Sequence, residues 1–279
     1  MIEELYFNSD EQVKISAASV GISKRRWICI SSKESVSGQH KIRMQKERID
    51  VLPIVEENGL IKEFFLTEKP NDYSSIERHR IKFENTLPLD TDIAIVISKL
   101  NDEKKRYYFL TRQKEVVGLI TIGNLNCKQV QIYIFNILCE LETLLSDFIN
   151  MHLSQKQIIE WLEKKSNSNK KYTEIIEAYN SLVKSELENM ITEHLYFTDL
   201  FSVIKDTGLA ENLGFSKNKW SDFNSINEVR NKIAHPTRSL LDSRNNITDL
   251  NRRLGKINEL IFCLKNFESE TPITKPKLH

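Results

Sequence analysis

Residues 107–125 read YYFLTRQKEVVGLITIGNL, and this stretch decides the fold of the N-terminal half. It holds two β-prone runs, residues 107–110 and 116–121, on either side of the polar residues 112–115. Short apolar runs that flank a polar turn are typical of a β-hairpin. The stretch therefore predicts two antiparallel strands joined by a tight turn.

The same pattern occurs earlier in the chain, at an offset of about 55 residues. Residues 49–55 and 60–66 are β-prone and flank Asn58 and Gly59, both of which tolerate the positive φ of a hairpin turn. Between the hairpins, residues 90–100 carry apolar side chains at helical spacing behind an Asp suited to N-capping. A helix, a hairpin and a following helix are thus expected twice, which predicts an α/β tandem repeat over residues 1–127.

Composition limits the functions of the whole chain. Lys and Arg number 40 and Asp and Glu 39, so the net charge of +1 draws the protein neither to nucleic acid nor to an anionic membrane, and RNA binding needs a local patch. The sequence has an acidic start and no run of about 18 apolar residues, which argues against a secretory signal and a membrane span. Its cysteines have no metal-ligand spacing and are expected to be reduced, mostly buried thiols. These features predict a cytoplasmic protein without a metal site or a membrane partner.

The end of the second hairpin, residues 118–125, reads GLITIGNL. It resembles the Gly-apolar-apolar-Thr/Ser-x-x-Asp-apolar signature of CBS repeats. The resemblance implies a CBS-like pair that takes an adenine nucleotide between its repeats as a regulatory ligand. Thr121 would then face a phosphate and residue 124 the ribose hydroxyls. Asn124 stands where the family has Asp.

The first repeat departs further from this signature. Glu63, Leu66 and Lys69 occupy the positions that correspond to residues 118, 121 and 124. That half-site is expected to be degenerate. A purely structural interpretation of the second half-site also stays open, in which Thr121 ends a strand and Asn124 caps a helix.

From residue 127 onward the character changes to helical periodicity for about 150 residues. A long helical pattern covers residues 129–165, with a break near Ser154. Further helices are expected near the ranges 172–194, 197–209, 225–235 and 247–267. This pattern predicts an all-α bundle over residues 128–270, with a disordered tail at 271–279.

Residues 225–236, which read SINEVRNKIAHP, are the most informative part of the helical half. Ser225 and Glu228 have the spacing of a capping box, and Pro236 disfavours helical geometry at the residue before it. A short helix is therefore expected between them. Its apolar residues 226, 229 and 233 share one face, while Asn231 and His235 stand together on the polar side.

This run is similar to the Arg-x4-6-His motif of HEPN domains, with four residues between Arg230 and His235. The resemblance implies an HEPN-like bundle and a homodimer through the helical half, in which two motif helices form one cleft. In nuclease members it implies metal-independent RNA cleavage without a cofactor. Carried onto this chain, it makes His235 the general acid and base, Arg230 the group that stabilises charge on phosphate, and Asn231 an orienting residue.

Taken together, the sequence predicts an α+β protein in which a CBS-like sensing domain regulates a metal-independent endoribonuclease. Its partner would be RNA, with Lys232 and Arg238 as candidate backbone contacts. Such proteins act as toxins or in antiviral defence, and the sequence does not identify an antitoxin. Two alternatives stay open. One is a non-catalytic dimeric scaffold in which Arg230 and His235 hold the interface; the other is an adenine-nucleotide sensor that serves a separate effector.

Overall fold

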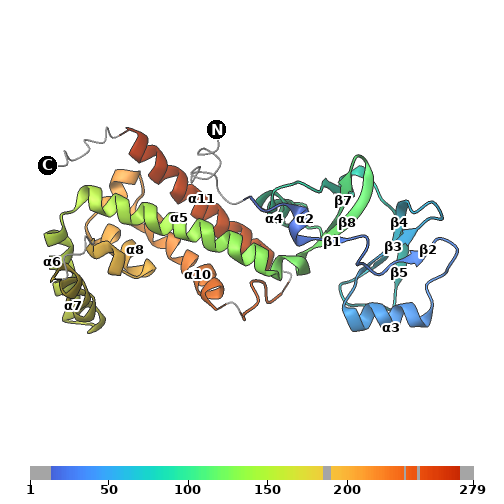
Figure 1. The fold of residues 1–279 in the computed structure, drawn as a ribbon, viewed down its shortest axis with the longest axis horizontal. Coiled ribbons are helices and arrows are strands. Elements are labelled where there is room, and N and C mark those ends of the chain that lie inside the picture. Colours follow the sequence, from blue (N-terminus) through green and yellow to red (C-terminus); the bar gives the residue numbers. More distant parts are fainter. Residues whose placement is uncertain (1–13, 185–189, 236, 244–245, 271–279) are drawn as a thin grey trace. The chain divides into compact units, whose positions relative to one another are not determined.

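A computed structural model gives the fold, and it describes residues 14–184, 190–235, 237–243 and 246–270 (Figure 1). The chain divides into two compact units, one of Met1–Gln131 with Leu241–Ile247 and one of Ile132–Leu240 with Thr248–His279. The tail expected at 271–279 lies outside the described residues. Within the described part, the helices are too short or too polar to cross a bilayer.

The first unit is a tandem of two strand-helix-hairpin repeats, of which the sequence predicted the helix and the hairpin. The first repeat consists of β2 (Ile30–Ser31), α3 (Gly38–Glu47), β3 (Val51–Val55) and β4 (Ile61–Thr67). The second consists of β6 (Thr86–Pro88), α4 (Ile93–Asp102), β7 (Tyr107–Arg112) and β8 (Glu115–Thr121). In each repeat the first strand pairs parallel to the second, and the hairpin is antiparallel. An edge strand completes each four-stranded sheet: β5 (Ile76–Arg80) gives the order β2-β3-β4-β5, and β1 (Ile22–Ser23), which follows α2 (Ala17–Val20), gives β1-β8-β7-β6.

The two hairpins share a register irregularity, which fixes how the repeats correspond. The shift lies between Ile54 and Val55 in β3 and between Leu110 and Thr111 in β7. With these bulges aligned, Glu63 takes the place of Gly118 and Leu66 that of Thr121, because their cross-strand partners also correspond. The correspondence expected from the sequence is confirmed.

The prediction of a helix after the first hairpin is wrong. Residues 68–75 form turns and bends, and β5 then pairs with β4. Pro70 disfavours helical geometry at Lys69, and Asn71 adopts a positive φ of 58°. In the second repeat a 3-10 turn, η2 (Ile122–Asn126), follows β8 and leads into the helical half.

Local signals at the turns and caps agree with the sequence. Gly59 has a φ of 77°, and the side chain of Asn58 accepts the N–H of Leu60 at 3.0 Å. Gly118 is required by packing, because a Cβ there would meet the carbonyl oxygen of Ile22 in β1 at 2.9 Å. The glycine of the CBS-like signature thus permits a close approach of the edge strand.

The two sheets of the first unit share a core. Val51 and Phe64 of the first repeat pack with Phe109 and Leu119 of the second. The rings of Phe64 and Phe109 meet edge to face with centroids 5.1 Å apart. This cluster makes the two repeats one folded unit and places the ends of their strands close together.

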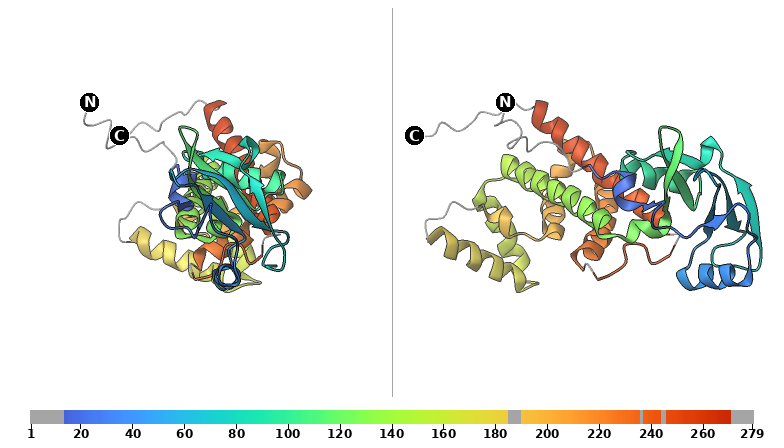
Figure 2. Two further views of the ribbon diagram at one scale, coloured as in Figure 1. Left: turned by 90° about the vertical axis from the view of Figure 1, so that its right-hand side faces the viewer. Right: turned by 45° about the vertical axis from the view of Figure 1, so that its right-hand side comes forward.

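The second unit is helical, with a helix in each of the predicted ranges and a further short helix at residues 217–222 that the sequence did not predict. Its helices are α5 (Lys128–His152), α6 (Gln155–Ser166), α7 (Lys171–Lys184), α8 (Phe197–Asp206), α9 (Lys217–Asp222), α10 (Ile226–Ala234) and α11 (Asn246–Glu270). The 3-10 turns between them are η3 (Ile191–His194), η4 (Leu209–Leu213) and η5 (Phe223–Ser225). The predicted break at Ser154 is confirmed, since its hydroxyl caps α6. The long helices α5 and α11 lie side by side (Figures 1 and 2), and the rings of Phe148 and Phe267 meet between them at 5.2 Å.

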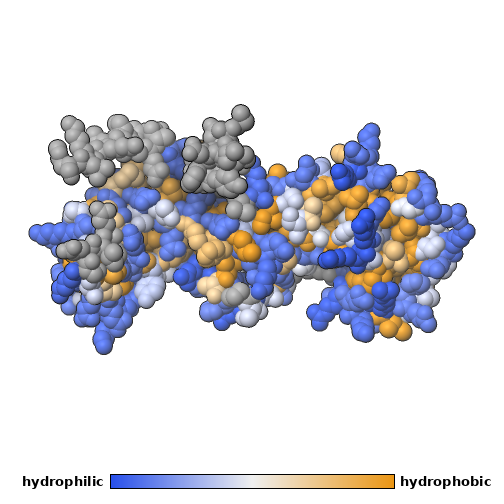
Figure 3. All heavy atoms as spheres, viewed as in Figure 1, coloured by the Kyte–Doolittle hydropathy of each residue, from blue (hydrophilic) through white to orange (hydrophobic). Residues whose placement is uncertain are grey.

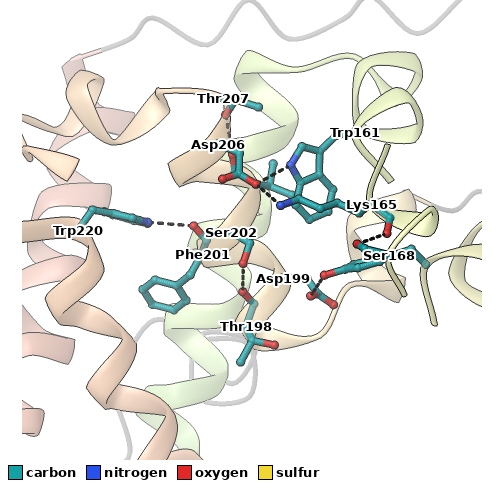
Figure 4. A network of polar contacts seen from close by, with 12 residues as sticks. Trp161, Lys165, Ser168, Thr198, Asp199, Phe201, Ser202, Asp206, Thr207 and Trp220 are labelled. Atoms are coloured by element: carbon teal, nitrogen blue, oxygen red, sulfur yellow. Dashed lines mark hydrogen bonds and ion pairs between the residues drawn. The ribbon is translucent and has the colours of Figure 1, made fainter. Parts of the chain in front are cut away.

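Two aspartates of α8 hold α6 and α7 in place. Asp199 is only 2% exposed and pairs with Lys171 of α7, with Nζ and Oδ1 2.7 Å apart. Asp206 accepts the indole N–H of Trp161 at 3.1 Å and pairs with Lys165 at 2.9 Å, both from α6 (Figure 4). These contacts connect α8 to the hairpin formed by α6 and α7.

The four cysteines are more exposed than expected. Cys29 and Cys139 are exposed, and Cys127 and Cys263 are half-buried. The prediction of mostly buried thiols was therefore wrong. Cysteine is small enough to lie at either face of an element, so residue type alone did not fix its burial.

Candidate functional site

A cavity of about 490 Å³ lies in the first unit, beside the start of β3 and the end of β8. Its walls come from segments that are far apart in the sequence: the stretch before β2, the end of α3, the turn after β8, and residues 241–243. The volume falls within the range of small-molecule sites, which is about 300–1,000 Å³.

Both predicted ligand residues of the second repeat line this cavity. The backbone N–H and the hydroxyl of Thr121 both donate to Oδ1 of Asn124, at 2.8 and 3.0 Å. Because a backbone N–H can only donate, Oδ1 must be the acceptor, and Nδ2 carries the remaining hydrogen-bonding capacity of the amide. Asn124 thus closes the turn after β8 and presents a donor where a carboxylate would present an acceptor. The structural interpretation and the ligand interpretation are both compatible with this geometry.

The cavity lining also contains two residues that sequence reasoning missed, Asp50 and Arg106. The backbone carbonyl of Asp50 accepts the N–H of Thr67 at 3.0 Å, just as that of Arg106 accepts the N–H of Ile122 at 3.2 Å. Asp50 and Arg106 therefore hold equivalent positions in the two repeats. Their side chains converge on Thr67, whose hydroxyl donates to Asp50 Oδ1 at 3.2 Å and whose carbonyl accepts from Arg106 Nη2 at 2.7 Å. An internal comparison of the residues that precede each hairpin could have indicated this pair.

The cavity lining combines charge with an apolar wall. It contains three arginines, Arg26, Arg48 and Arg106, and also the acidic residues Glu47, Asp50 and Asp242. Of these arginines, Arg26 and Arg48 are exposed and Arg106 is half-buried. The apolar part of the wall consists of Ile22, Trp27, Ile28, Ile49, Val51, Leu119 and Ile122. Such a lining suits a ligand with an anionic group at one end and a flat apolar group at the other.

The motif helix α10 lies in the second unit and has the predicted apolar face. Ile226, Val229 and Ile233 are buried, at 0, 1 and 8% exposure. Asn231 and His235 are exposed, which confirms that the core does not use them. His235 ends the helix at φ −115° and ψ 81°.

The predicted capping box at the start of α10 is wrong. Ser225 has helical φ and ψ because η5 runs directly into α10, and its hydroxyl donates to the carbonyl of Asp222 at 2.9 Å. Glu228 instead pairs with Arg253 of α11. The buried Lys256 of α11 pairs with Asp222 at 2.7 Å and reaches the hydroxyl of Ser225 at 2.9 Å. Two ion pairs thus fasten the beginning of the motif helix to α11.

Arg230 is half-buried and lies near Glu142 of α5. Burial raises the pKa of the Glu142 carboxyl, and the charge of Arg230 opposes this rise. Glu142 lines a groove of about 850 Å³ in the helical unit, together with Asp147 and Glu193. Burial raises the pKa of Asp147 as well. The described residues that line this groove include no Lys or Arg, so it repels phosphate.

The two candidate RNA contacts beside the motif are placed differently. Lys232 is half-buried, and its Nζ donates to the carbonyl of Leu240 at 3.0 Å. Arg238 is exposed, and its backbone N–H donates to the carbonyl of His235 at 2.8 Å. Across the described residues, no group of three or more His, Cys, Asp or Glu side chains is arranged to hold a metal ion.

Comparison with solved structures finds similar CBS-domain proteins over about two fifths of the chain. CBSX2 in complex with AMP is 12% identical, with 42% of this chain and 97% of that chain covered and a TM-score of 0.33. The CBS domain of a bacterial CNNM/CorC family Mg²⁺ transporter in complex with ATP is 14% identical, with 44% and 88% covered and a TM-score of 0.31. A conserved CBS-domain protein of unknown function from Thermoplasma acidophilum is 16% identical, with 40% and 68% covered and a TM-score of 0.30.

No protein-family model matches the chain. No curated protein matches it either. At these identities and TM-scores, the similar structures assign neither a ligand nor an activity to this protein.

Proposed function

We propose that the first unit is a regulatory module that senses an adenine nucleotide in the cavity beside Thr121 and Asn124. The observation that carries the proposal is the lining of that cavity, in which arginines and the Thr121 hydroxyl stand beside an apolar wall. The resemblance of residues 118–125 to the CBS signature supports the same class of ligand.

We assign the phosphates to the exposed guanidinium of Arg26, which lines the cavity next in sequence to Trp27 and whose planar donors match phosphate oxygens. The amide Nδ2 of Asn124 adds a neutral donor. The base would pack on the apolar wall beside Trp27. Asn124 leaves the ribose hydroxyls without the carboxylate of the CBS signature, so we expect the phosphates to contribute most of the affinity.

Isothermal titration calorimetry with AMP, ADP and ATP tests this proposal. Arg26→Ala removes charge-assisted hydrogen bonds worth about 1.5–3 kcal/mol, so the Kd is expected to rise about 10- to 150-fold. Arg25→Ala is the matched control, because Arg25 is the exposed neighbour in sequence and does not line the cavity. An unchanged Kd in Arg26→Ala, or no heat with any of the nucleotides, would refute the proposed site.

For the helical unit, we propose that it is a metal-independent endoribonuclease that acts as a homodimer. The observation that favours it is the exposure of Asn231 and His235 at the end of a helix that is fastened to α11. The imidazole of His235 would take the proton of a ribose 2′-hydroxyl, whose oxygen then attacks the adjacent phosphorus. The 5′-oxygen leaves with a proton from a second imidazole, in the other copy of α10, and a cyclic phosphate remains. Arg230 would stabilise the phosphorane charge.

The surface of the helical unit offers an apolar stripe for such a dimer. Ile132 and Phe135 of α5 are 54 and 53% exposed, and the exposed Cys139 follows at helical spacing. Hydrophobic residues are visible at the surface in Figure 3. RNA would approach α10 away from the acidic groove beside Glu142, since the carboxylates there repel its backbone.

Cleavage of tRNA and total RNA in EDTA tests the nuclease, with wild type compared with His235→Ala and Asn231→Ala. His79→Ala, in β5 of the first unit, is the control for loss of a histidine. We expect cleavage to be lost in His235→Ala while size-exclusion chromatography shows the same dimer. Intact RNA with the wild type, together with weaker dimers of Arg230→Ala and His235→Ala, would favour the non-catalytic scaffold. Intact RNA with tight nucleotide binding would favour a sensor for a separate effector.

A further inference from the structure

Two consecutive leucines after α10 are held by different parts of the protein. The carbonyl of Leu240 accepts a hydrogen bond from Lys232 Nζ of α10 at 3.0 Å. The N–H of Leu241 donates to Asn126 Oδ1 at 2.7 Å, and its carbonyl accepts from Asn126 Nδ2 at 3.0 Å. Leu240 and Leu241 are 3 and 5% exposed. Both ends of this peptide are therefore fixed by burial and by hydrogen bonds.

Residues 240–243, here termed the strap, also form part of the cavity wall. Leu241, Asp242 and Ser243 line the cavity, and so does Asn126, which lies two residues after Asn124. The side-chain amide of Asn126 binds the backbone of Leu241 both as a donor and as an acceptor. A ligand that fills the cavity thus lies against the strap, and the position of the strap affects the shape of the site.

The other end of the strap reaches the motif helix. Lys232 lies in the last turn of α10, between Arg230 and His235. A single peptide bond joins Leu240, which Lys232 holds, to Leu241, which Asn126 holds. Sequence reasoning gave no signal for this connection, because residues 126 and 241 are far apart in the chain and only the fold brings them together.

We infer that the strap carries the effect of a ligand in the cavity to the end of α10 that bears His235. The inference rests on the proposed nucleotide site and adds the route by which that site regulates the helical unit. A ligand shifts a conformational equilibrium only by its different affinity for the two arrangements. In this inference the difference lies at the strap, because Leu241, Asp242 and Ser243 form part of the cavity wall and Asn126 holds Leu241 there. Binding therefore stabilises the held strap, and through Leu240 it restrains Lys232.

Hydrogen–deuterium exchange of the full chain, with and without ATP at a concentration that saturates binding in calorimetry, tests the inference. In the wild type, ATP is expected to slow exchange of the strap peptide, residues 237–243, and of residues 230–235. A slowing of about 5-fold or more corresponds to the usual range of coupling between sites. Asn126 lines the cavity, so ATP is expected to bind Asn126→Ala more weakly; at a concentration that saturates this variant in calorimetry, the slowing is lost at both places.

Lys232→Met removes the hydrogen bond from Lys232 to Leu240 and keeps the hydrogen bonds between Asn126 and Leu241. ATP is then expected to protect the strap peptide but not residues 230–235. Asn101→Ala, a substitution in α4 that touches neither the cavity nor the strap, is the matched control and should behave as the wild type. Circular dichroism establishes that each variant is folded.

The outcomes separate the two proposals. If no nucleotide gives binding heat or protects residues 47–51 and 119–126, the nucleotide site is wrong and the inference fails with it. If ATP binds and protects those residues while residues 237–243 exchange as before, the site stands and the strap inference is overturned. Loss of protection in Asn126→Ala together with its retention in Asn101→Ala supports the strap.

Discussion

The ion pair between Asp199 and Lys171 offers a quantitative test of how the helical unit is held together. Asp199 lies at the start of α8 and is 2% exposed. Its Oδ1 accepts Lys171 Nζ at 2.7 Å and the hydroxyl of Tyr172 at 3.1 Å, and Oδ2 accepts the N–H of Tyr196 at 3.3 Å. Replacing Asp199 by Ala leaves three donors without an acceptor. One of them is a cation whose side chain is 31% exposed and can partly regain water.

Breaking a buried ion pair by removing one partner costs about 3–5 kcal/mol, and the partial exposure of Lys171 places Asp199→Ala near 3 kcal/mol. Asp199→Asn keeps one acceptor oxygen, which can serve either Tyr196 N–H or the donors of Lys171 and Tyr172, and turns an NH2 group towards the others, so a cost of about 1–3 kcal/mol is expected. Asp206→Ala is the matched control on the same helix. Its side chain is 35% exposed, so its ion pair is worth about 0–1 kcal/mol, and its hydrogen bond from the indole N–H of Trp161 adds about 0.5–1.5 kcal/mol.

Urea unfolding followed by tryptophan fluorescence measures these costs. A Trp27→Phe background leaves Trp161 and Trp220 as reporters, and both lie in the helical unit. Burial opposes the charge of Lys171, but the hydrogen bond and charge of Asp199 raise its pKa above the usual 10.5. A raised lysine pKa gives stability that is present below pH 10.5 and is lost only above it. Equal losses for Asp199→Ala and Asp206→Ala at pH 7 would refute the assignment of Asp199 as the stronger contact.

Three further substitutions give independent tests. Burial raises the pKa of Glu142 above 4.5, against the opposing charge of Arg230, so the charged carboxylate disfavours the fold at neutral pH. Glu142→Gln should raise the Tm of the helical unit at pH 7, and the gain should vanish as the pH falls below 4.5; an equal gain at pH 4 and pH 7 would contradict this. Gly118→Ala should destabilise the first unit by about 1–3 kcal/mol in urea unfolding followed by the fluorescence of Trp27, which is retained here, because its Cβ meets the carbonyl of Ile22, and an unchanged midpoint would argue against that contact. Gly59→Ala should cost about 1–2 kcal/mol in the same assay because of its positive φ, and a neutral result would imply that the turn rearranges.

Features of the fold that depend on neighbouring residues could be predicted from the sequence. The two hairpins followed from alternating apolar and turn residues, and the break between α5 and α6 followed from Ser154. The predicted capping box failed because Lys256, thirty-one residues after Ser225, holds the residues before α10 in helical geometry. The helix predicted after the first hairpin followed from the repeat pattern, although Pro70 disfavours helical geometry at Lys69.

The candidate site was less accessible to sequence reasoning. Thr121 and Asn124 were found because they lie within one local signature, and the structure places both in one cavity. Asp50 and Arg106 come from different repeats, and Asp242 comes from the far end of the chain. Only tertiary packing brings these charges to one cavity. For Arg230, Asn231 and His235 the structure gives position and exposure, while their role stays a prediction.

The pair Asp50 and Arg106 makes the charge of the cavity lining differ between the two repeats. Two equivalent positions that carried the same charge would let a ligand enter the cavity in either of two orientations. Here one position is negative and the other positive, so turning an anionic ligand round would exchange attraction for repulsion. In the proposed nucleotide site, this asymmetry would favour one orientation of an anionic ligand.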